Sequence, residues 1–152
     1  MIDSTDKKIL KLLSLDAAMS ATDIGNTVGL SVPAVNKRIA RMRSGGIIKN
    51  FTVITDEKQV GKSVTAFILL VLQYGDAVDK LMEHIKSDTD ILECYAVTGE
   101  YDYIIKICAS GVEALEEKLL SLKRQKGVIK SHTMLSLMEH KFNAAVLPDE
   151  VN

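Results

Sequence analysis

The stretch that decides the fold of the N-terminal part of the chain is residues 20–46, SATDIGNTVGLSVPAVNKRIARMRSGG. Ser20 and Ser31 are both good N-cap residues, and each precedes a run of apolar side chains at helical spacing. Gly29 lies between the two runs, where a tight turn needs a residue that adopts positive φ. The stretch therefore predicts two short helices that meet at a tight corner.

The spacing across this corner fits a helix-turn-helix. Gly25, Gly29 and Val35 stand at offsets of four and six residues. They supply a small residue where the helices cross, a glycine for the turn and an apolar residue that locks the second helix. A two-helix corner without any role in nucleic-acid binding is the alternative, because such corners are common.

A further helix is predicted upstream of the corner. Asp3 is a good N-cap, and Asp6 suits the first turn, where an acidic side chain interacts favourably with the helix dipole. Ile9, Leu10 and Leu13 form the apolar stripe of this helix. The three helices together define a first domain that we expect to span residues 1–50.

Downstream of the glycines at 45 and 46, the apolar pattern changes from helical to extended. Residues 47–55 predict a strand, and residues 51–63 are expected to form a hinge strand and linker. Strands are then predicted at 64–74, 91–98, 103–109 and 128–142, with helices at 77–86 and 112–126. This order is that of a ferredoxin-like βαββαβ domain, which we expect over residues 64–152. The predicted fold class is α+β.

Composition excludes several classes of protein. The chain has 152 residues, of which 47% are hydrophobic, and its net charge is −1, which excludes intrinsic disorder. The longest unbroken apolar run, residues 66–72, is far shorter than the roughly 20 residues of a membrane-spanning helix. No signal peptide is visible, and the two cysteines are too few for a disulfide scaffold. We therefore expect a cytoplasmic protein with reduced thiols and no membrane partner.

The small net charge hides an asymmetry between the two parts of the chain. Residues 1–50 contain eight Lys or Arg and four Asp, a net charge of +4, and the remaining residues carry −5. A basic module followed by an acidic one predicts different partners for the two, and the basic one could bind a polyanion.

The second helix of the corner carries a cationic face opposite its apolar stripe of Val35, Ile39 and Met42. In the major groove, Asn reads adenine edges and Arg binds guanine or phosphate. We therefore expect binding to double-stranded DNA, with a merely solvated face as the alternative. The candidate contact residues are Ser31, Ala34, Asn36, Lys37, Arg38, Arg41 and Arg43.

Motifs spread along nearly the whole chain resemble one family. They are Ile2-Asp3-x-x-Asp6-x-x-Ile9-Leu10, Gly29-Leu30-Ser31, Val35-x-x-Arg38-Ile39-x-x-Met42, Gly46-Ile47-Ile48, Gly99-Glu100-Tyr101-Asp102-Tyr103, Gly127-Val128 and Thr133. In this combination the chain resembles the Lrp/AsnC (feast/famine) transcriptional regulators. One departure is Gly25, which stands where alanine is usual and should loosen its helix by roughly 0.5–1 kcal/mol.

The resemblance implies a winged helix-turn-helix domain joined to an effector-binding and oligomerisation domain. It also implies homodimers that assemble into octamers and an amino-acid effector bound between dimers. The turn at residues 99–103 is the expected effector site. Its candidate residues are Gly99 for close backbone approach, Asp102 for the ammonium group, Thr133 for the carboxylate, and Tyr101 and Tyr103 for the pocket wall. A structural turn, with Asp102 in an Asx-type hydrogen bond, is the alternative.

Two other functions compete with an effector-responsive regulator. An architectural DNA-wrapping protein would share the same fold without sensing a ligand. An enzyme would need a convergent acid–base or nucleophilic set, which the sequence does not offer, so we expect no catalytic residues and no cofactor. A metal site is not expected either, because His84, His132 and His140 lie apart and none pairs with a cysteine.

Overall fold

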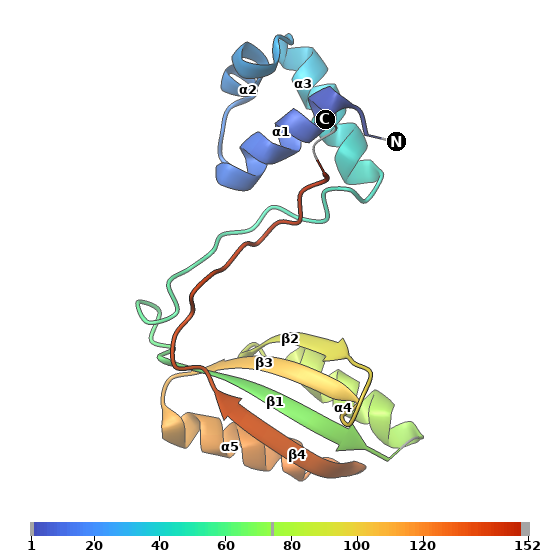
Figure 1. Ribbon diagram of the computed structural model, residues 1–152, viewed down its shortest axis with the longest axis vertical. Helices are drawn as coiled ribbons and strands as arrows, with labels where there is room; N and C mark the ends of the chain where they lie inside the picture. Colours follow the sequence, from blue (N-terminus) through green and yellow to red (C-terminus); the bar gives the residue numbers. More distant parts are fainter. Residues whose placement is uncertain (1, 74, 150–152) are drawn as a thin grey trace. The chain divides into compact units, whose positions relative to one another are not determined.

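The computed structural model describes residues 2–73 and 75–149. These residues form two units (Figure 1). The first contains residues 2–54 together with 141–149, and the second contains residues 55–140. The expected division assigned residues 141–152 to the second domain. The structure instead groups the described part of this tail with the first unit, where the Lys7 ammonium donates a hydrogen bond of 2.6 Å to the Asp149 carbonyl.

The first unit contains three helices, α1 (Ser4–Leu15), α2 (Ala21–Val28) and α3 (Val32–Ser44). The expected caps of the first two are confirmed: Asp3 and Asp6 form a capping box, and the Ser20 side chain accepts a hydrogen bond from the Asp23 amide. Ser31 precedes α3 as expected, but its side chain makes no capping hydrogen bond. Ile9, Ile24, Val35 and Met42 form the fully buried core, to which every helix contributes.

Close packing shapes the corner between α2 and α3. Gly29 ends α2 with a φ of +72°, as the turn requires, and the Leu30 amide donates to the Gly25 carbonyl at 3.0 Å. A Cβ atom on Gly25 would lie only 2.5 Å from the Leu30 carbonyl oxygen. Gly25 therefore permits this close approach, as expected for the small residue where the two helices cross.

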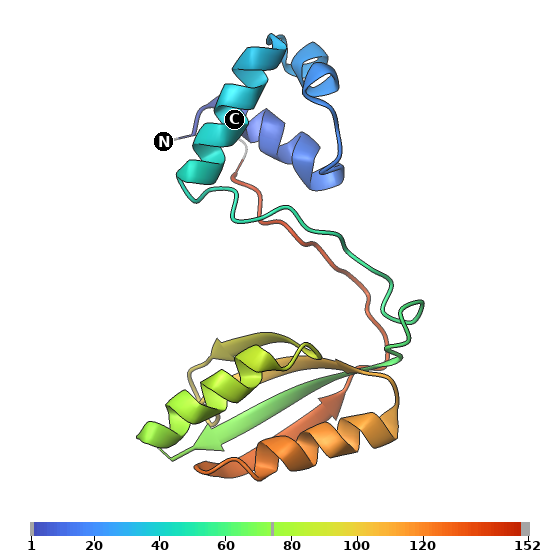
Figure 2. The same ribbon diagram turned by 180° about the vertical axis from the view of Figure 1, so that it is seen from behind.

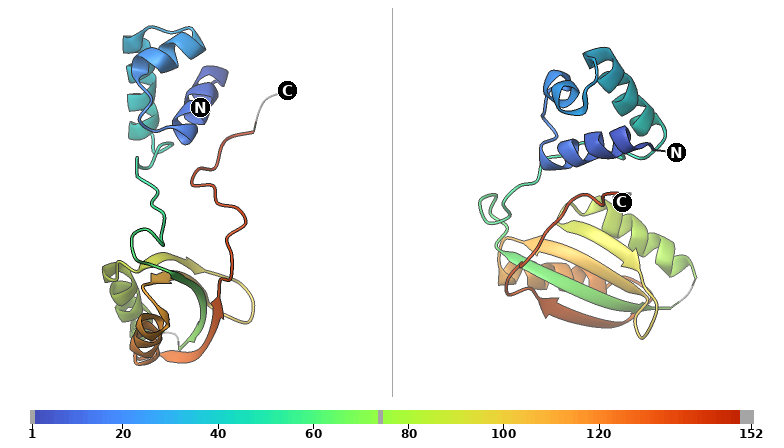
Figure 3. Two further views of the ribbon diagram at one scale, coloured as in Figure 1. Left: turned by 90° about the vertical axis from the view of Figure 1, so that its left-hand side faces the viewer. Right: turned by 45° about the horizontal axis from the view of Figure 1, so that its top comes forward.

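The second unit confirms the predicted βαββαβ order. Its elements are β1 (Val64–Leu72), α4 (Asp76–Ser87), β2 (Ile91–Ala96), β3 (Tyr103–Ala109), α5 (Val112–Lys123) and β4 (Val128–Leu135). The four strands form an antiparallel sheet in the order β2-β3-β1-β4. Figure 2 and the left view of Figure 3 show both helices on one face of this sheet.

The core of the second unit lies between that face and the two helices. Alternate residues of β1, from Ala66 to Leu72, are buried there together with Leu81 of α4 and Leu122 of α5. The intervening residues of β1, such as Phe67 and Leu69, lie on the other face and are partly exposed. The sheet thus presents a second face that no helix covers, on which the side chains of β1 are mostly apolar.

Two predicted strands differ in the single chain. Residues 47–55 form no strand there: Ile47 and Ile48 donate to the Met42 carbonyl at the end of α3, and the rest find no ladder partner within the described chain. For the same reason the described residues of the first unit contain no β-structure that could serve as a wing. The last strand ends at Leu135, where pairing with β1 stops, and not at residue 142. None of the helices in the described part of the chain is long and apolar enough to span a membrane.

Candidate functional site

The outer face of α3 presents an amide and several cations. Among the expected contact residues, Asn36, Lys37, Arg41 and Arg43 are exposed, as is Ser31 just before the helix. Ala34 and Arg38 are half-buried. On the opposite side of the helix, the fully buried Val35 and Met42 hold α3 against the rest of the unit. The exposed side chains therefore lie on a helix whose opposite face is packed in the core of the first unit.

Two aspartates from the start of α1 bind two of the three arginines of α3. Arg38 Nη1 donates to Asp3 Oδ2 at 2.6 Å and to Asp6 Oδ1 at 2.8 Å, and Arg41 Nη2 donates to Asp6 Oδ2. The hydrogen bond from Arg38, together with the one from the Asp6 amide, lowers the pKa of Asp3. In turn, hydrogen bonds to Asp3 and Asp6 raise the pKa of Arg38. Sequence reasoning missed this pairing across more than 30 positions, because capping-box spacing explains both aspartates locally.

Arg43 takes a different environment at the end of α3. Its guanidinium carbon lies 5.6 Å from the centroid of the Phe51 ring, a cation–π distance. The side chain is exposed, so its charge remains accessible to an anion. Chemically, the face of α3 can donate hydrogen bonds to phosphates and can both donate to and accept from base edges through Asn36.

The connection between β2 and β3 forms the second candidate site, and it bends toward β1 (Figure 1). Asp102 fixes it there: its amide donates to the Leu70 carbonyl at 2.9 Å, and its Oδ2 accepts from the Leu72 amide at 2.8 Å. The Val97 amide closes the turn by donating to the Asp102 carbonyl at 2.9 Å. Asp102 therefore holds the turn against β1 through a bond to a distant amide, which is not the local Asx-type bond of the structural alternative. Its Oδ1 has no hydrogen-bond partner in the described part of the chain.

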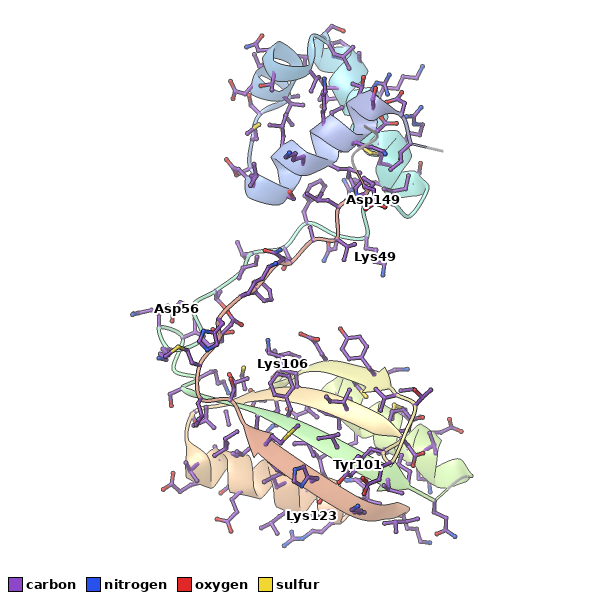
Figure 4. All side chains as sticks on the ribbon, viewed as in Figure 1. Lys49, Asp56, Tyr101, Lys106, Lys123 and Asp149 are labelled. Atoms are coloured by element: carbon purple, nitrogen blue, oxygen red, sulfur yellow. The ribbon has the colours of Figure 1, made fainter. Side chains whose placement is uncertain are left out.

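The tip of this turn lies against β4 (Figure 4). The Lys130 ammonium is 4.8 Å from the centroid of the Tyr101 ring and 2.6 Å from Glu100 Oε1. The His132 ring lies on the same side, with its centroid 6.3 Å from that of Tyr101. The hydrogen bond between Lys130 and Glu100 lowers the pKa of the carboxyl and raises the pKa of the ammonium. Gly99 opens the turn, with a φ of +121°.

Not all of the expected effector residues come together. Tyr103 pairs with Leu70 and packs, partly buried, against the core of the second unit. Thr133 pairs with the buried Ile68, which places its side chain on the helix-covered face. The turn instead contacts Lys130 and His132, which sequence reasoning missed. The sequence did predict that residues 130 and 132 lie on one face of the strand and residue 133 on the other. Which of these faces the turn contacts depends on the strand register.

A fixed helix with an exposed amide and cations is typical of a DNA-binding module, and here it is joined to a separate α+β unit. Residues 2–43 match the family model of the AsnC-type helix-turn-helix domain, and residues 65–146 match that of the Lrp/AsnC ligand binding domain. The chain belongs to the Lrp/AsnC family of transcriptional regulators. It is a DNA-binding regulator and not an enzyme.

Several known proteins are similar to this chain over almost its full length. The chain is 33% identical to the HTH-type transcriptional regulator FL11 of Pyrococcus furiosus, covering 93% of each chain. It is 34% identical to the transcriptional regulator AzlB of Bacillus subtilis, covering 99% of this chain and 98% of the relative. A transcriptional regulator of Neisseria meningitidis, solved in complex with L-Met, has the same fold, with a TM-score of 0.92, 24% identity and 96% coverage of each chain.

Proposed function

We propose that the protein is a sequence-specific regulator whose DNA binding or assembly responds to a small amino acid. The observation that carries this proposal is the face of α3, where Asn36, Lys37 and Arg41 stand exposed on a helix held by fully buried Val35 and Met42. Lys37 and Arg41 supply phosphate or guanine contacts, and Asn36 supplies base readout. Ser31 and Arg43, at the two ends of α3, bind the phosphate backbone of the DNA. Ala34 and Arg38, being half-buried, support the interface.

For the effector we propose a site around the turn at residues 99–102. The Oδ1 atom of Asp102 accepts a hydrogen bond from the ammonium group of the amino acid, and the side chains of Lys130 and His132 face its carboxylate. The L-Met complex of the Neisseria relative supports an amino acid as the class of ligand. Tyr101 provides an apolar surface beside these groups.

The proposed assembly is a homodimer that builds an octamer in the cytoplasm. Residues 47–55 carry apolar side chains with large exposed fractions, 86% at Val53 and 63% at Ile54. Pairing with the same segment of a second copy would satisfy the backbone and cover these side chains. The apolar face of the sheet, with Phe67 and Leu69, would be covered in the same dimer. A dimer presents two copies of α3, which favours DNA half-sites about one helical turn apart or multiples of it.

A screen of the twenty amino acids tests the effector proposal. A ligand that binds only the native state stabilises it by roughly 2.7 kcal/mol at 100 times its dissociation constant, so one or a few amino acids should raise the melting temperature. The same amino acids should change DNA affinity in a fluorescence anisotropy titration. If DNA binds but no amino acid changes either quantity, the alternative of an architectural DNA-wrapping protein replaces the regulator.

A further inference from the structure

The Asp6 carboxylate is an anion placed directly beneath the cationic face of α3. It is fully buried and forms its hydrogen bonds with Arg38 and Arg41 of that helix and with the Asp3 amide. A buried carboxylate of this kind persists only when it is paired and hydrogen-bonded. It lies in a different helix from the residues that read DNA, and DNA is itself an anion. An anion beneath the helix proposed to contact DNA would be expected to weaken DNA binding unless it has a further role there.

The two arginines use this carboxylate differently. Arg38 has a side-chain exposure of 26%, and its Nη1 atom is shared between Asp3 and Asp6. Arg41 has a side-chain exposure of 57% and reaches Asp6 through Nη2. A guanidinium has five N–H donors in a rigid planar fork, so one bond to Asp6 restrains the half-exposed side chain and leaves other donors free of Asp6. Arg38 is a structural contact, whereas Arg41 can bind two anions at once.

We propose that Asp6 is a positioning residue for DNA binding, which holds the Arg41 guanidinium in one orientation so that its remaining donors meet a phosphate or a guanine edge. The inference rests on the proposed DNA-contacting role of α3 and adds the residue that organises it. A free arginine on a helix samples many rotamers, and ordering it on binding opposes affinity. Asp6 orders Arg41 before DNA arrives.

One substitution separates this role from simple electrostatics, because the two predict opposite changes in DNA affinity. Asp6→Asn keeps the shape but removes the negative charge. An amide oxygen in the place of Oδ2 can still accept from the Asp3 amide and from Arg41, but the bond to Arg41 is then no longer charge-assisted. If Asp6 acts only as a nearby charge, its removal reduces repulsion and DNA binds more tightly. If Asp6 positions Arg41, affinity falls, by about tenfold for the loss of one well-oriented charge-assisted contact.

The control for charge is Asp3→Ser. Serine remains a good N-cap, and the substitution removes one negative charge from the same cluster, but Asp3 contacts Arg38 and not Arg41. We expect this variant to bind DNA as tightly as the wild type or more tightly. The control for coupling is Asp6→Asn in an Arg41→Ala background, where no further loss of affinity should follow.

The experiment is a fluorescence anisotropy titration of each full-length variant with a random-sequence duplex and with duplexes selected from a randomised pool by the wild type. Circular dichroism establishes that each variant is folded. Should Asp6→Asn not fold, Arg41→Lys decides, because an ammonium keeps the charge but lacks the planar fork and should lose a similar factor.

Wild-type or tighter binding by folded Asp6→Asn, or full affinity of Arg41→Lys, overturns the proposal. Unchanged affinity of both Lys37→Ala and Arg41→Ala instead removes the assignment of α3 as the DNA-contacting helix. Loss in Arg41→Ala together with a gain in Asp6→Asn keeps that assignment and rejects positioning alone. The two failures are therefore distinguishable.

Discussion

At the scale of single residues, Asp102 combines a structural and a proposed binding role in one carboxylate. Its Oδ2 atom accepts from the Leu72 amide, and its Oδ1 atom is the proposed partner of the effector ammonium. The two oxygens can be separated by the choice of substitution, because asparagine retains one acceptor but not the charge. A structural role and a binding role of Asp102 therefore predict different effects of Asp102→Asn and Asp102→Ala on stability and on ligand affinity.

We expect Asp102→Asn to fold with near wild-type stability, because its amide oxygen can accept from Leu72. Its affinity for the responsive amino acid should fall by roughly 10- to 150-fold, as expected for a lost charge-assisted hydrogen bond of about 1.5–3 kcal/mol. Asp102→Ala should in addition lose about 1–3 kcal/mol of stability, since the Leu72 amide loses its partner. Calorimetric titration and thermal unfolding measure the two effects. Equal ligand affinity in wild type and Asp102→Asn would leave Asp102 as a purely structural residue.

At the scale of elements, local signals predicted most of the fold. Asp3 and Ser20 begin helices as their chemistry suggests, and Gly29 ends one with the expected positive φ. The order of strands and helices after residue 63 also followed from local periodicity. Residues 47–55 form no strand in the single chain, because strand composition describes the residues themselves whereas a ladder needs a partner.

Part of the candidate site could not be read from the sequence for a related reason. The exposed residues of α3 follow from helical periodicity alone, so Asn36 and Lys37 were predictable. The contact between Arg41 and Asp6 depends on how two helices pack, and the contact between Tyr101 and His132 depends on strand register. Both are set by tertiary structure and leave no signal in local spacing.

An ion cluster joins three elements of the second unit and makes its stability depend on pH. Lys62, before β1, lies 2.6 Å from Asp90 Oδ1, and Lys118 of α5 lies 3.2 Å from Asp90 Oδ2 and 2.6 Å from Asp88. The hydrogen bond from Lys62 lowers the pKa of Asp90, desolvation opposes this shift, and Lys118 lowers the pKa further. The folded state therefore holds the Asp90 proton less tightly than the unfolded state does.

Because the pKa of Asp90 is lowered in the folded state, we expect its contribution to folding stability to be fully present above the unfolded pKa of about 3.9. It should be lost as the pH falls through the lower folded value. Asp90→Asn should be less stable than the wild type at neutral pH, and the difference should shrink in acid. Urea unfolding at a series of pH values measures this, with the exposed Asp79→Asn on α4 as control. A constant difference between wild type and Asp90→Asn across the acid range would contradict the role of the cluster.

At the scale of the whole molecule, the open face of the sheet predicts self-association. Met134 of β4 pairs with Phe67 of β1 on that face and has an exposed fraction of 43%. Burying a lysine there in a dimer is costly, whereas its cost in the isolated unit is small. Leu120 of α5 has the same exposed fraction of 43% and lies on a helix that covers the other face of the sheet, so it is a matched control.

We expect the wild type and Leu120→Lys to be dimers or larger at micromolar concentration, and Met134→Lys to shift toward the monomer. Light scattering reports the mass directly. A wild-type mass of 16.7 kDa, that of a single chain, would contradict self-association altogether. Equal masses for the two lysine variants would move the interface away from the open face of the sheet.

The central claim is that the outer face of α3 binds DNA, and the most direct measurement is the salt dependence of binding for Lys37→Ala. Lys123→Ala on α5 removes the same charge from the second unit and serves as its control. Losing one phosphate contact reduces the slope of log affinity against log salt concentration by about 0.9. We expect a weaker affinity and this smaller slope in Lys37→Ala, with both quantities unchanged in Lys123→Ala. Wild-type affinity and slope in Lys37→Ala would contradict the assignment.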